Sequence, residues 1–341
     1  MAPIRTAPLA APPASPAPVG TPAAPVPGES AGRGADGRMG ANGLVTTNGR
    51  AVLLMVLAMA LFAGDDALLK LASSLPMGTS AGEVIAFHGA FGVLIFGAMM
   101  LARGERLTRD LVTDPPVLWR TGGDVLAATA FVTALTMMEL GNASAILQVQ
   151  PLVVTLGAAL LLKEHVGPRR RVAVLVGLLG VLVIIRPGLA GFTPVSGLVL
   201  VGVAGLAARD LSTRVVSSRH STVALSTLVC LAIVPAGLAL HLATTGAVPF
   251  ATVGSHAMWI LLAAGSLGNV GYWCVTQAAR VGEVSAIAPF RYSRLVFAVL
   301  LGWLVFGEVP DGPMIVGSLL VVGAGAYALR REAVVSSAAR S

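Results

Sequence analysis

Cysteine and charged residues are both scarce in this chain, and each scarcity excludes a class of protein. The only cysteines, Cys230 and Cys274, lie inside apolar runs, so the sequence holds neither a disulfide framework nor a zinc-type cysteine spacing. Charged residues make up 11% of the chain, whereas a soluble domain averages about 25% because its surface must be wetted. With 55% hydrophobic residues, most of the folded surface must face lipid.

The net charge of +7 does not indicate a nucleic-acid partner. The basic residues stand in short clusters between apolar runs, which is the placement that membrane topology requires. No nucleic-acid binding is therefore expected.

Ten apolar runs of about the length that crosses a bilayer core follow one another along the chain. Nine spans is the main alternative, and the connections are too short to hold an extramembrane domain. The predicted fold class is an all-α integral membrane protein with ten transmembrane helices. The expected spans are residues 51–72, 82–102, 118–139, 143–162, 170–187, 195–215, 222–243, 255–278, 284–306 and 312–330.

Residues 1–48 differ in composition from everything that follows. Ala and Pro dominate the stretch from Ala2 to Pro27, and a segment rich in Gly, Arg and Asp comes next. Such a segment lacks the apolar core of a signal peptide and cannot bury enough surface to fold. We expect a disordered cytoplasmic tail at 1–48, a short cytoplasmic tail at 332–341, and Met39 as an alternative start.

The basic residues also predict the orientation. With the N-terminus in the cytoplasm, nineteen of the 23 Lys and Arg residues fall inside and only Lys70 and Arg186 fall near the outer ends. This bias follows the positive-inside rule. Both termini are therefore expected in the cytoplasm, with the protein in a cell (inner) membrane.

Two segments of the chain echo each other. The first reads SAILQVQPLVV and ends in LLLKE at Glu164, and the second reads SAIAPFRYSRLVF and ends in LVFGE at Glu308. Counting back from each Glu sets Gln148 opposite Tyr292 and Gln150 opposite Arg294. Five spans per half is an odd number, so a duplicated half would insert in the opposite orientation, as in many secondary transporters.

These segments resemble the two repeats of the EamA family, part of the drug/metabolite transporter superfamily. LFAGDDALLKLAS in the first span and ARDLSTR in the sixth resemble the branch with S-adenosylmethionine and riboflavin carriers. The resemblance implies a first repeat at 50–188 and an inverted second repeat at 195–331. Members of the family move amino acids, nucleoside-like compounds, vitamins and amphipathic cations, so the cargo is not fixed. Where that branch usually carries Arg, this chain has His88, which puts an anion contact there in doubt.

The strongest candidates for a substrate site lie deep in the span 284–306. A charge at bilayer depth costs at least ~2.5–3.5 kcal/mol, so Arg291 and Arg294 are expected to face a cavity. Arginine keeps its proton and its fork suits carboxylate or phosphate. Pro289 just before them removes a backbone donor and can open the helix around Tyr292. The alternative is an ion pair with an acid on another helix; the acids considered are Asp124, Asp210 and Glu283.

Further substrate-binding candidates are two pairs of polar or aromatic residues. Gln148 and Gln150, next to Pro151, would add amide contacts or hold helices together. Trp273 and Gln277 are four residues apart and could offer stacking plus an amide, although aromatic residues also anchor helices at the membrane interface.

Candidates for proton coupling or gating lie in the first, second and sixth spans. Asp66 and Lys70 are spaced to pair on one helix face, which would leave Asp65 turned elsewhere. An Asp beside His88 would form a proton site, because histidine titrates near neutrality. The remaining charges are interpreted as topology, cap or gate residues: Asp210 with Arg209 and Arg214, Arg120 with Asp124, and the helix-ending Glu164 and Glu308.

The resemblance implies a secondary transporter that moves a small polar or amphipathic metabolite by alternating access. An intramembrane enzyme acting on a lipid-linked substrate is the alternative, and a channel or scaffold is the third class. No Walker motif is present, so ATP is not the expected energy source. We expect no enzymatic activity, no cofactor and no metal site. The expected partners are membrane lipid, a small-molecule substrate and protons as coupling ion, with the oligomeric state open.

Overall fold

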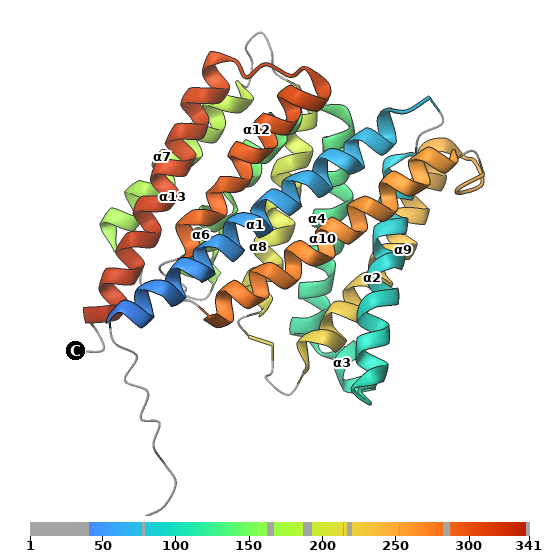
Figure 1. The fold of residues 1–341 in the computed structure, drawn as a ribbon, viewed down its shortest axis with the longest axis horizontal. Coiled ribbons are helices and arrows are strands. Elements are labelled where there is room, and N and C mark those ends of the chain that lie inside the picture. Colours follow the sequence, from blue (N-terminus) through green and yellow to red (C-terminus); the bar gives the residue numbers. More distant parts are fainter. Residues whose placement is uncertain are drawn as a thin grey trace, which may run out of the picture. The chain divides into compact units, whose positions relative to one another are not determined.

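The computed structural model describes residues 41–76, 79–161, 167–186, 193–213, 215–216, 220–251, 253–281 and 287–338. Regular secondary structure in these ranges is entirely helical (Figure 1). In chain order the elements are α1 (Ala41–Ser74), α2 (Ala81–Ala102), α3 (Arg109–Thr113), α4 (Pro115–Met137), α5 (Leu140–Leu147), α6 (Gln150–Leu161), α7 (Pro168–Ile185), α8 (Val195–Thr213), α9 (Thr222–Thr245), α10 (Ser255–Val281), the 3-10 helix η1 (Ala288–Tyr292), α12 (Ser293–Phe306) and α13 (Gly312–Ala338).

Seven helical segments in the described part of the chain are long and apolar enough to cross a membrane. Two shorter apolar helices, at Arg171–Ile185 and Gly312–Tyr327, accompany them. Many large apolar side chains lie on the surface, such as Leu53, Trp119 and Trp259, each 71% exposed. A surface with so many exposed apolar side chains is matched to lipid rather than water. The expected class, an all-α multi-pass membrane protein, is confirmed.

Several helix boundaries differ from those expected. Helix α1 begins at Ala41, so residues 41–48 are helical where a tail is expected, and α13 continues to Ala338. Residues 1–40 of the expected tail lie outside the described residues. The expected span 143–162 is two helices, α5 and α6, because the chain makes a turn at Gln148 and Val149.

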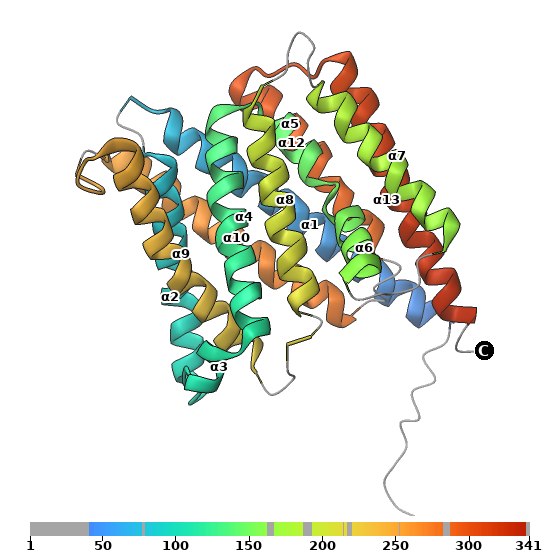
Figure 2. The same cartoon turned by 180° about the vertical axis from the view of Figure 1, so that it is seen from behind.

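The helices pack in pairs that join the two halves of the chain. Helix α1 packs against α10, α4 against α8, α2 against α9, and α7 against α13. Figures 1 and 2 show α7 and α13 side by side at one edge and α2 and α9 at the opposite edge. Helices α1, α4, α8, α10 and α12 lie between these edges, and α12 contacts both α1 and α5.

Local sequence sets several helix ends. Ser80 begins α2 with a capping box, in which its hydroxyl accepts from the Glu83 N–H at 3.2 Å and its own N–H donates to the Glu83 carboxylate at 2.8 Å. Helix α12 ends at Gly307, whose φ of 69° is left-handed and therefore suits glycine.

Glycine also sets how closely two of the helix pairs approach. A Cβ on Gly123 of α4 would lie 2.6 Å from the Gly205 carbonyl oxygen of α8, and a Cβ on Gly205 would lie 2.6 Å from that of Gly123. Gly82 of α2 and Gly237 of α9 form a similar reciprocal contact. Small residues allow such backbone contact, which is how membrane helices pack without a hydrophobic driving force.

Candidate functional site

Two helices in the middle of the molecule are interrupted, and each interruption carries polar residues. Pro151 cannot donate a backbone hydrogen bond, and just before it the Val149 N–H bonds to Ile146, only three residues back. Pro289 likewise opens the 3-10 helix η1 that leads into α12. Irregular backbone within a membrane is tolerated where it is enclosed by protein or lines a cavity. The interruptions therefore mark a polar centre.

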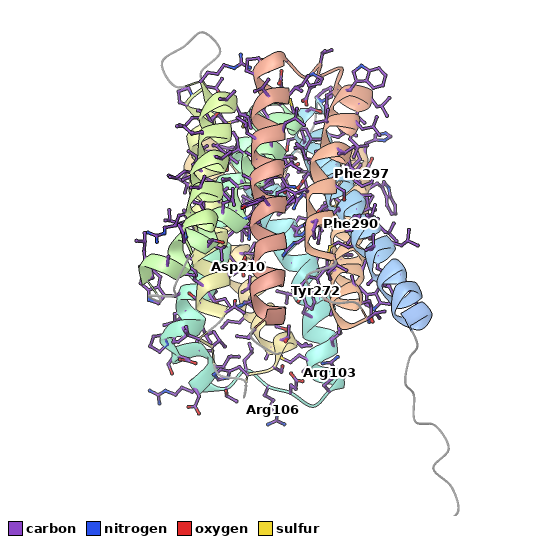
Figure 3. The ribbon with its side chains drawn as sticks, turned by 90° about the vertical axis from the view of Figure 1, so that its left-hand side faces the viewer. Arg103, Arg106, Asp210, Tyr272, Phe290 and Phe297 are labelled. Atoms are coloured by element: carbon purple, nitrogen blue, oxygen red, sulfur yellow. The ribbon has the colours of Figure 1, made fainter. Side chains whose placement is uncertain are left out.

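The two interruptions meet. The Gln148 side-chain amide donates to the backbone carbonyl of Arg291 at 3.3 Å, across 143 residues of sequence. Figure 3 shows Phe290, the neighbour of Arg291, and Asp210 partway along the helices, whereas Arg103 and Arg106 lie at one end. The contact thus lies partway along the helices rather than at their ends.

Arg294 forms an ion pair with Asp66 of α1. Its Nη2 and Nε atoms donate to the same Asp66 oxygen at 2.6 Å and 3.2 Å, and its guanidinium lies 5.5 Å from the centre of the Phe62 ring. The Asp66 side chain is only 6% exposed. The predicted pairing of Asp66 with Lys70 is therefore wrong, because a guanidinium from α12 occupies that carboxylate. The acids considered as partners of Arg294 did not include Asp66.

A related contact joins the residues that the repeat sets opposite Arg294 and Asp66. Gln150 of α6 donates to Asp210 of α8 at 2.8 Å. Gln150 is the residue opposite Arg294 in the repeat, and the GDDALLK and ARDLSTR segments set Asp210 opposite Asp66 and Arg209 opposite Asp65. Equivalent positions of the two halves thus bond to one another in both places, once through an arginine and once through a glutamine.

Asp210 also belongs to a chain of ion pairs that joins α8 to α4. Arg209 contacts Asp210 at 2.8 Å and Asp124 at 3.2 Å, and Arg120 lies 3.7 Å from Asp124. The predicted pairing of Arg120 with Asp124 is confirmed. Arg214, the expected partner of Asp210, and Glu283 lie outside the described residues.

Asp65 and His88 approach each other beside α10. A Cβ on Gly268 would lie 2.8 Å from the Asp65 Oδ2 atom and 3.3 Å from His88 Cε1, so both side chains border the same point. Asp65 is 8% exposed, and its Oδ1 atom is buried without a hydrogen-bond partner in the described ranges. Its burial next to a histidine is the arrangement that a proton site requires.

Arg291 differs from the other central arginines because no carboxylate contacts it in the described part of the chain. Its side chain is exposed, although its backbone is held by Gln148 at the centre of the bundle. The charged groups that act on it are Asp210 and Arg209 of α8 and the neighbouring Arg294. Within the described residues, Arg291 is therefore influenced by the charges of α8 without forming an ion pair with a carboxylate.

In the described ranges, no hydrogen bond or ion pair joins three other predicted substrate-binding residues to this centre. Tyr292 is buried with its hydroxyl against Gly325 of α13, and that oxygen has no partner among the described residues. Trp273 on α10 is 58% exposed. Neither Trp273 nor Gln277 makes a hydrogen bond or ring contact within the described ranges. The structure thus gathers Gln148, Gln150, Asp66, Asp210, Arg291 and Arg294 but not these three.

One end of the molecule is closed by contacts between the halves. Lys70 of α1 forms an ion pair with Glu308, at the turn between α12 and α13, and donates to the Met138 carbonyl at 2.7 Å. Glu308 also accepts from the Leu140 N–H at 2.8 Å. This arrangement joins α1, the start of α5 and the end of α12. Glu164, which occupies the position of Glu308 in the first repeat, lies outside the described residues.

At the same turn, Asp311 forms an ion pair with Arg186 at the end of α7. Its carboxylate also accepts from the Met314 N–H at 2.9 Å, as an N-cap residue does. The hydrogen bond from Arg186 lowers the pKa of Asp311 below its usual 3.8, with the Met314 N–H and the charge of Arg186 also lowering it and burial opposing them.

This lowered pKa predicts a pH-dependent contribution to stability. A carboxyl whose pKa is depressed by folding stabilises the protein above its unfolded pKa and loses that contribution as pH falls through the folded pKa. Asp311→Asn should therefore lower the melting temperature of the purified protein at pH 6 to 7, and the difference from wild type should vanish well below pH 3.8. Because the side chain is 48% exposed, salt should weaken the effect. A constant difference across the pH range would contradict this assignment.

A multi-pass helical bundle with charged and amide side chains beside paired helix interruptions is typical of a membrane transporter. Comparison with known families agrees, because the model of the EamA-like transporter family matches residues 49–186 and 195–329. The chain therefore belongs to this family, within the drug/metabolite transporter superfamily, and is a transporter of small metabolites.

The curated relatives are named as transporters of several different compounds. A riboflavin transporter of Rhizobium johnstonii is 31% identical, with 61% of this chain and 67% of the relative covered. The pseudopaline exporter CntI of Pseudomonas aeruginosa is also 31% identical, covering 80% of this chain and 93% of the relative. An S-adenosylmethionine uptake transporter of Rickettsia prowazekii is 25% identical, covering 73% of this chain and 83% of the relative. A solved crystal structure with 21% identity matches with a TM-score of 0.53, covering 82% of this chain and 96% of the other, which supports the fold.

Proposed function

We propose that this protein is a secondary active transporter that moves a small polar or amphipathic organic metabolite by alternating access between its two halves. The observation that carries the proposal is the contact between the two helix interruptions, where Gln148 bonds to the Arg291 carbonyl. On either side of it lie the Asp66–Arg294 and Gln150–Asp210 contacts, each of which joins one half to the other. A site built between two halves can open to one side when the halves tilt.

The proposed topology has ten spans, with α5 and α6 counted as one and η1 and α12 as another. The first repeat runs from α1 to α7 and the inverted second repeat from α8 to α13. The pairs α2 with α9 and α7 with α13 join equivalent helices, and α1 with α10 corresponds to α8 with α4, which supports a twofold relation. The start of α1 and the end of α13 lie at the same end of the bundle, which supports cytoplasmic termini in an inner membrane (Figure 2).

The proposed coupling ion is the proton, held at Asp65 beside His88. Asp66 and Arg294 are the charged groups nearest to Asp65, so a proton there would act directly on the central ion pair. The proposed gate at the outer end is the Lys70–Glu308 contact.

The cargo class follows from the polar centre and from the relatives, which are named for riboflavin, pseudopaline and S-adenosylmethionine. These names favour a transporter over the alternative, an enzyme acting on a lipid-linked substrate. Saturable counterflow of one such metabolite in proteoliposomes is the expected result. Flux that does not saturate would indicate a channel, and metal-dependent turnover of a lipid would indicate an enzyme.

The Gln148 side-chain amide, which joins the two helix interruptions, allows a test in which only one hydrogen bond is removed. A hydrogen bond contributes about 0.5–1.5 kcal/mol, so Gln148→Ala should lower counterflow about twofold to tenfold while the protein remains folded. Asn142→Ala is the matched control, because within the described residues the Asn142 side chain bonds only to Glu139 at the start of α5. Equal counterflow in wild type and Gln148→Ala would move the site away from the helix interruptions.

A further inference from the structure

Among the described residues at the centre of the bundle, one arginine lacks the carboxylate contact that the other three make. Three of the four central arginines contact a carboxylate: Arg294 lies 2.6 Å from Asp66, Arg209 lies 2.8 Å from Asp210, and Arg120 lies 3.7 Å from Asp124. Arg291 has no such contact within the described residues. Its charged neighbours on α8, Asp210 and Arg209, are already bonded to each other, and Asp210 also accepts from Gln150.

An unneutralised guanidinium at this depth calls for a ligand. Arginine cannot relieve the cost of burial by losing its proton, and a deep unpaired charge costs several kcal/mol. The side chain of Arg291 is exposed, so a solute entering the centre can reach its fork. A carboxylate or phosphate can accept two parallel hydrogen bonds from that fork.

The repeat supplies an internal comparison. Counting back from Glu308 and Glu164 sets Leu147 opposite Arg291, and Leu147 is buried at the same helix interruption. The fold of the interruption therefore does not need a cation at this position. Arg294, by contrast, has a polar counterpart in Gln150, and both bond to an aspartate of the other half.

We infer that the cargo carries one anionic group, a carboxylate or a phosphate, which Arg291 alone neutralises. Arg294 positions α12 against α1 through Asp66 and does not share the anion. This assignment rests on the proposed transport function and narrows its substrate class to metabolites with an acidic group. It also replaces the expectation of a paired Arg291–Arg294 clamp with a single cation.

The first test needs no cargo. Arg291→Leu, which copies the residue of the other repeat, should leave the melting temperature of the purified protein unchanged or raise it, because it removes an unpaired charge. Arg294→Leu should lower the melting temperature, because it leaves Asp66 unpaired. A loss of stability in Arg291→Leu equal to that in Arg294→Leu would show that Arg291 has a structural partner and would overturn the inference.

The second test uses acetate as the anion and acetamide as its neutral analogue, at equal ionic strength. A ligand at ten times its dissociation constant raises the folding equilibrium constant about elevenfold. Acetate should therefore raise the melting temperature of wild type more than acetamide does, and this difference should disappear in Arg291→Leu. Arg106→Leu is the control, because Arg106 is exposed at one end of the molecule (Figure 3).

Equal effects of acetate and acetamide on wild type, or an acetate effect that survives in Arg291→Leu, would overturn the anion site. These readouts measure binding and stability in the full-length protein without flux. A protein that binds acetate at Arg291 but shows no saturable counterflow would therefore contradict the proposed function while leaving the anion site in place.

Discussion

Arg294→Gln should destabilise the protein by about 3–5 kcal/mol and abolish transport, because it leaves a buried carboxylate without its cation. Asp66 receives two hydrogen bonds from Arg294, at 2.6 Å and 3.2 Å, and its side chain is 6% exposed. Asp65, the next residue, adds a second buried carboxyl at the same place. Thermal or denaturant unfolding in detergent measures the loss, and counterflow in proteoliposomes measures transport.

A glutamine at position 294 is not expected to compensate the charge of Asp66, although Gln150 donates a hydrogen bond to the equivalent residue Asp210. Asp210 keeps Arg209 as a second partner at 2.8 Å, whereas the residue equivalent to Arg209 beside Asp66 is Asp65. The double variant Asp66→Asn with Arg294→Gln should recover most of the lost stability, because no unpaired charge then remains. If Arg294→Gln alone melts at the wild-type temperature, the ion pair does not hold α1 against α12.

Gly123→Ala should destabilise the protein by about 1–3 kcal/mol, because the added methyl group overpacks the contact between α4 and α8. Its Cβ would lie 2.6 Å from the Gly205 carbonyl oxygen and 2.8 Å from the Arg209 backbone nitrogen, and backbone atoms cannot rotate away. Gly123→Val should cost more. The shift of α8 should also disturb Arg209 and lower counterflow.

The neighbouring glycine is a matched control for this change. A Cβ on Gly122 would meet nothing within 4 Å, so Gly122→Ala should be neutral or slightly stabilising because alanine favours the helix. Melting temperatures of the two single variants, measured in the same detergent, compare the effects directly. Equal shifts for positions 122 and 123 would mean that the close contact of α4 with α8 does not limit packing.

The sequence predicts most of the helices because the underlying signals are local, but it does not predict that the span 143–162 divides into α5 and α6. A run of apolar residues indicates a span, and Pro151 and Pro289 mark the places where backbone hydrogen bonds are lost. The same local signal singles out the polar residues beside each proline as binding candidates, and their role in binding stays a prediction. The lengths of α1 and α13 are not predicted, since each helix extends beyond the apolar stretch that indicates a membrane span.

The ion pairs could not be predicted in the same way, because they join residues far apart in the chain. Spacing along a helix favours Asp66 with Lys70, but Asp66 bonds to Arg294, 228 residues away, and Lys70 to Glu308, 238 residues away. One signal was available: the repeat sets Arg294 opposite Gln150 and Asp66 opposite Asp210. Each bond joins one half to the other, so the bond between Gln150 and Asp210 implies the equivalent bond between Arg294 and Asp66.

The unequal chemistry of these two equivalent bonds limits how the chain can be divided. Two copies of the first half would bring Asp66 against Gln150 with Asp65 alongside, leaving an excess of negative charge. Two copies of the second half would bring Asp210 against Arg294 with Arg209 alongside, leaving an excess of positive charge. Neither half is complementary to itself in charge at this place, so we expect that two copies of either half alone would not form a stable symmetric dimer.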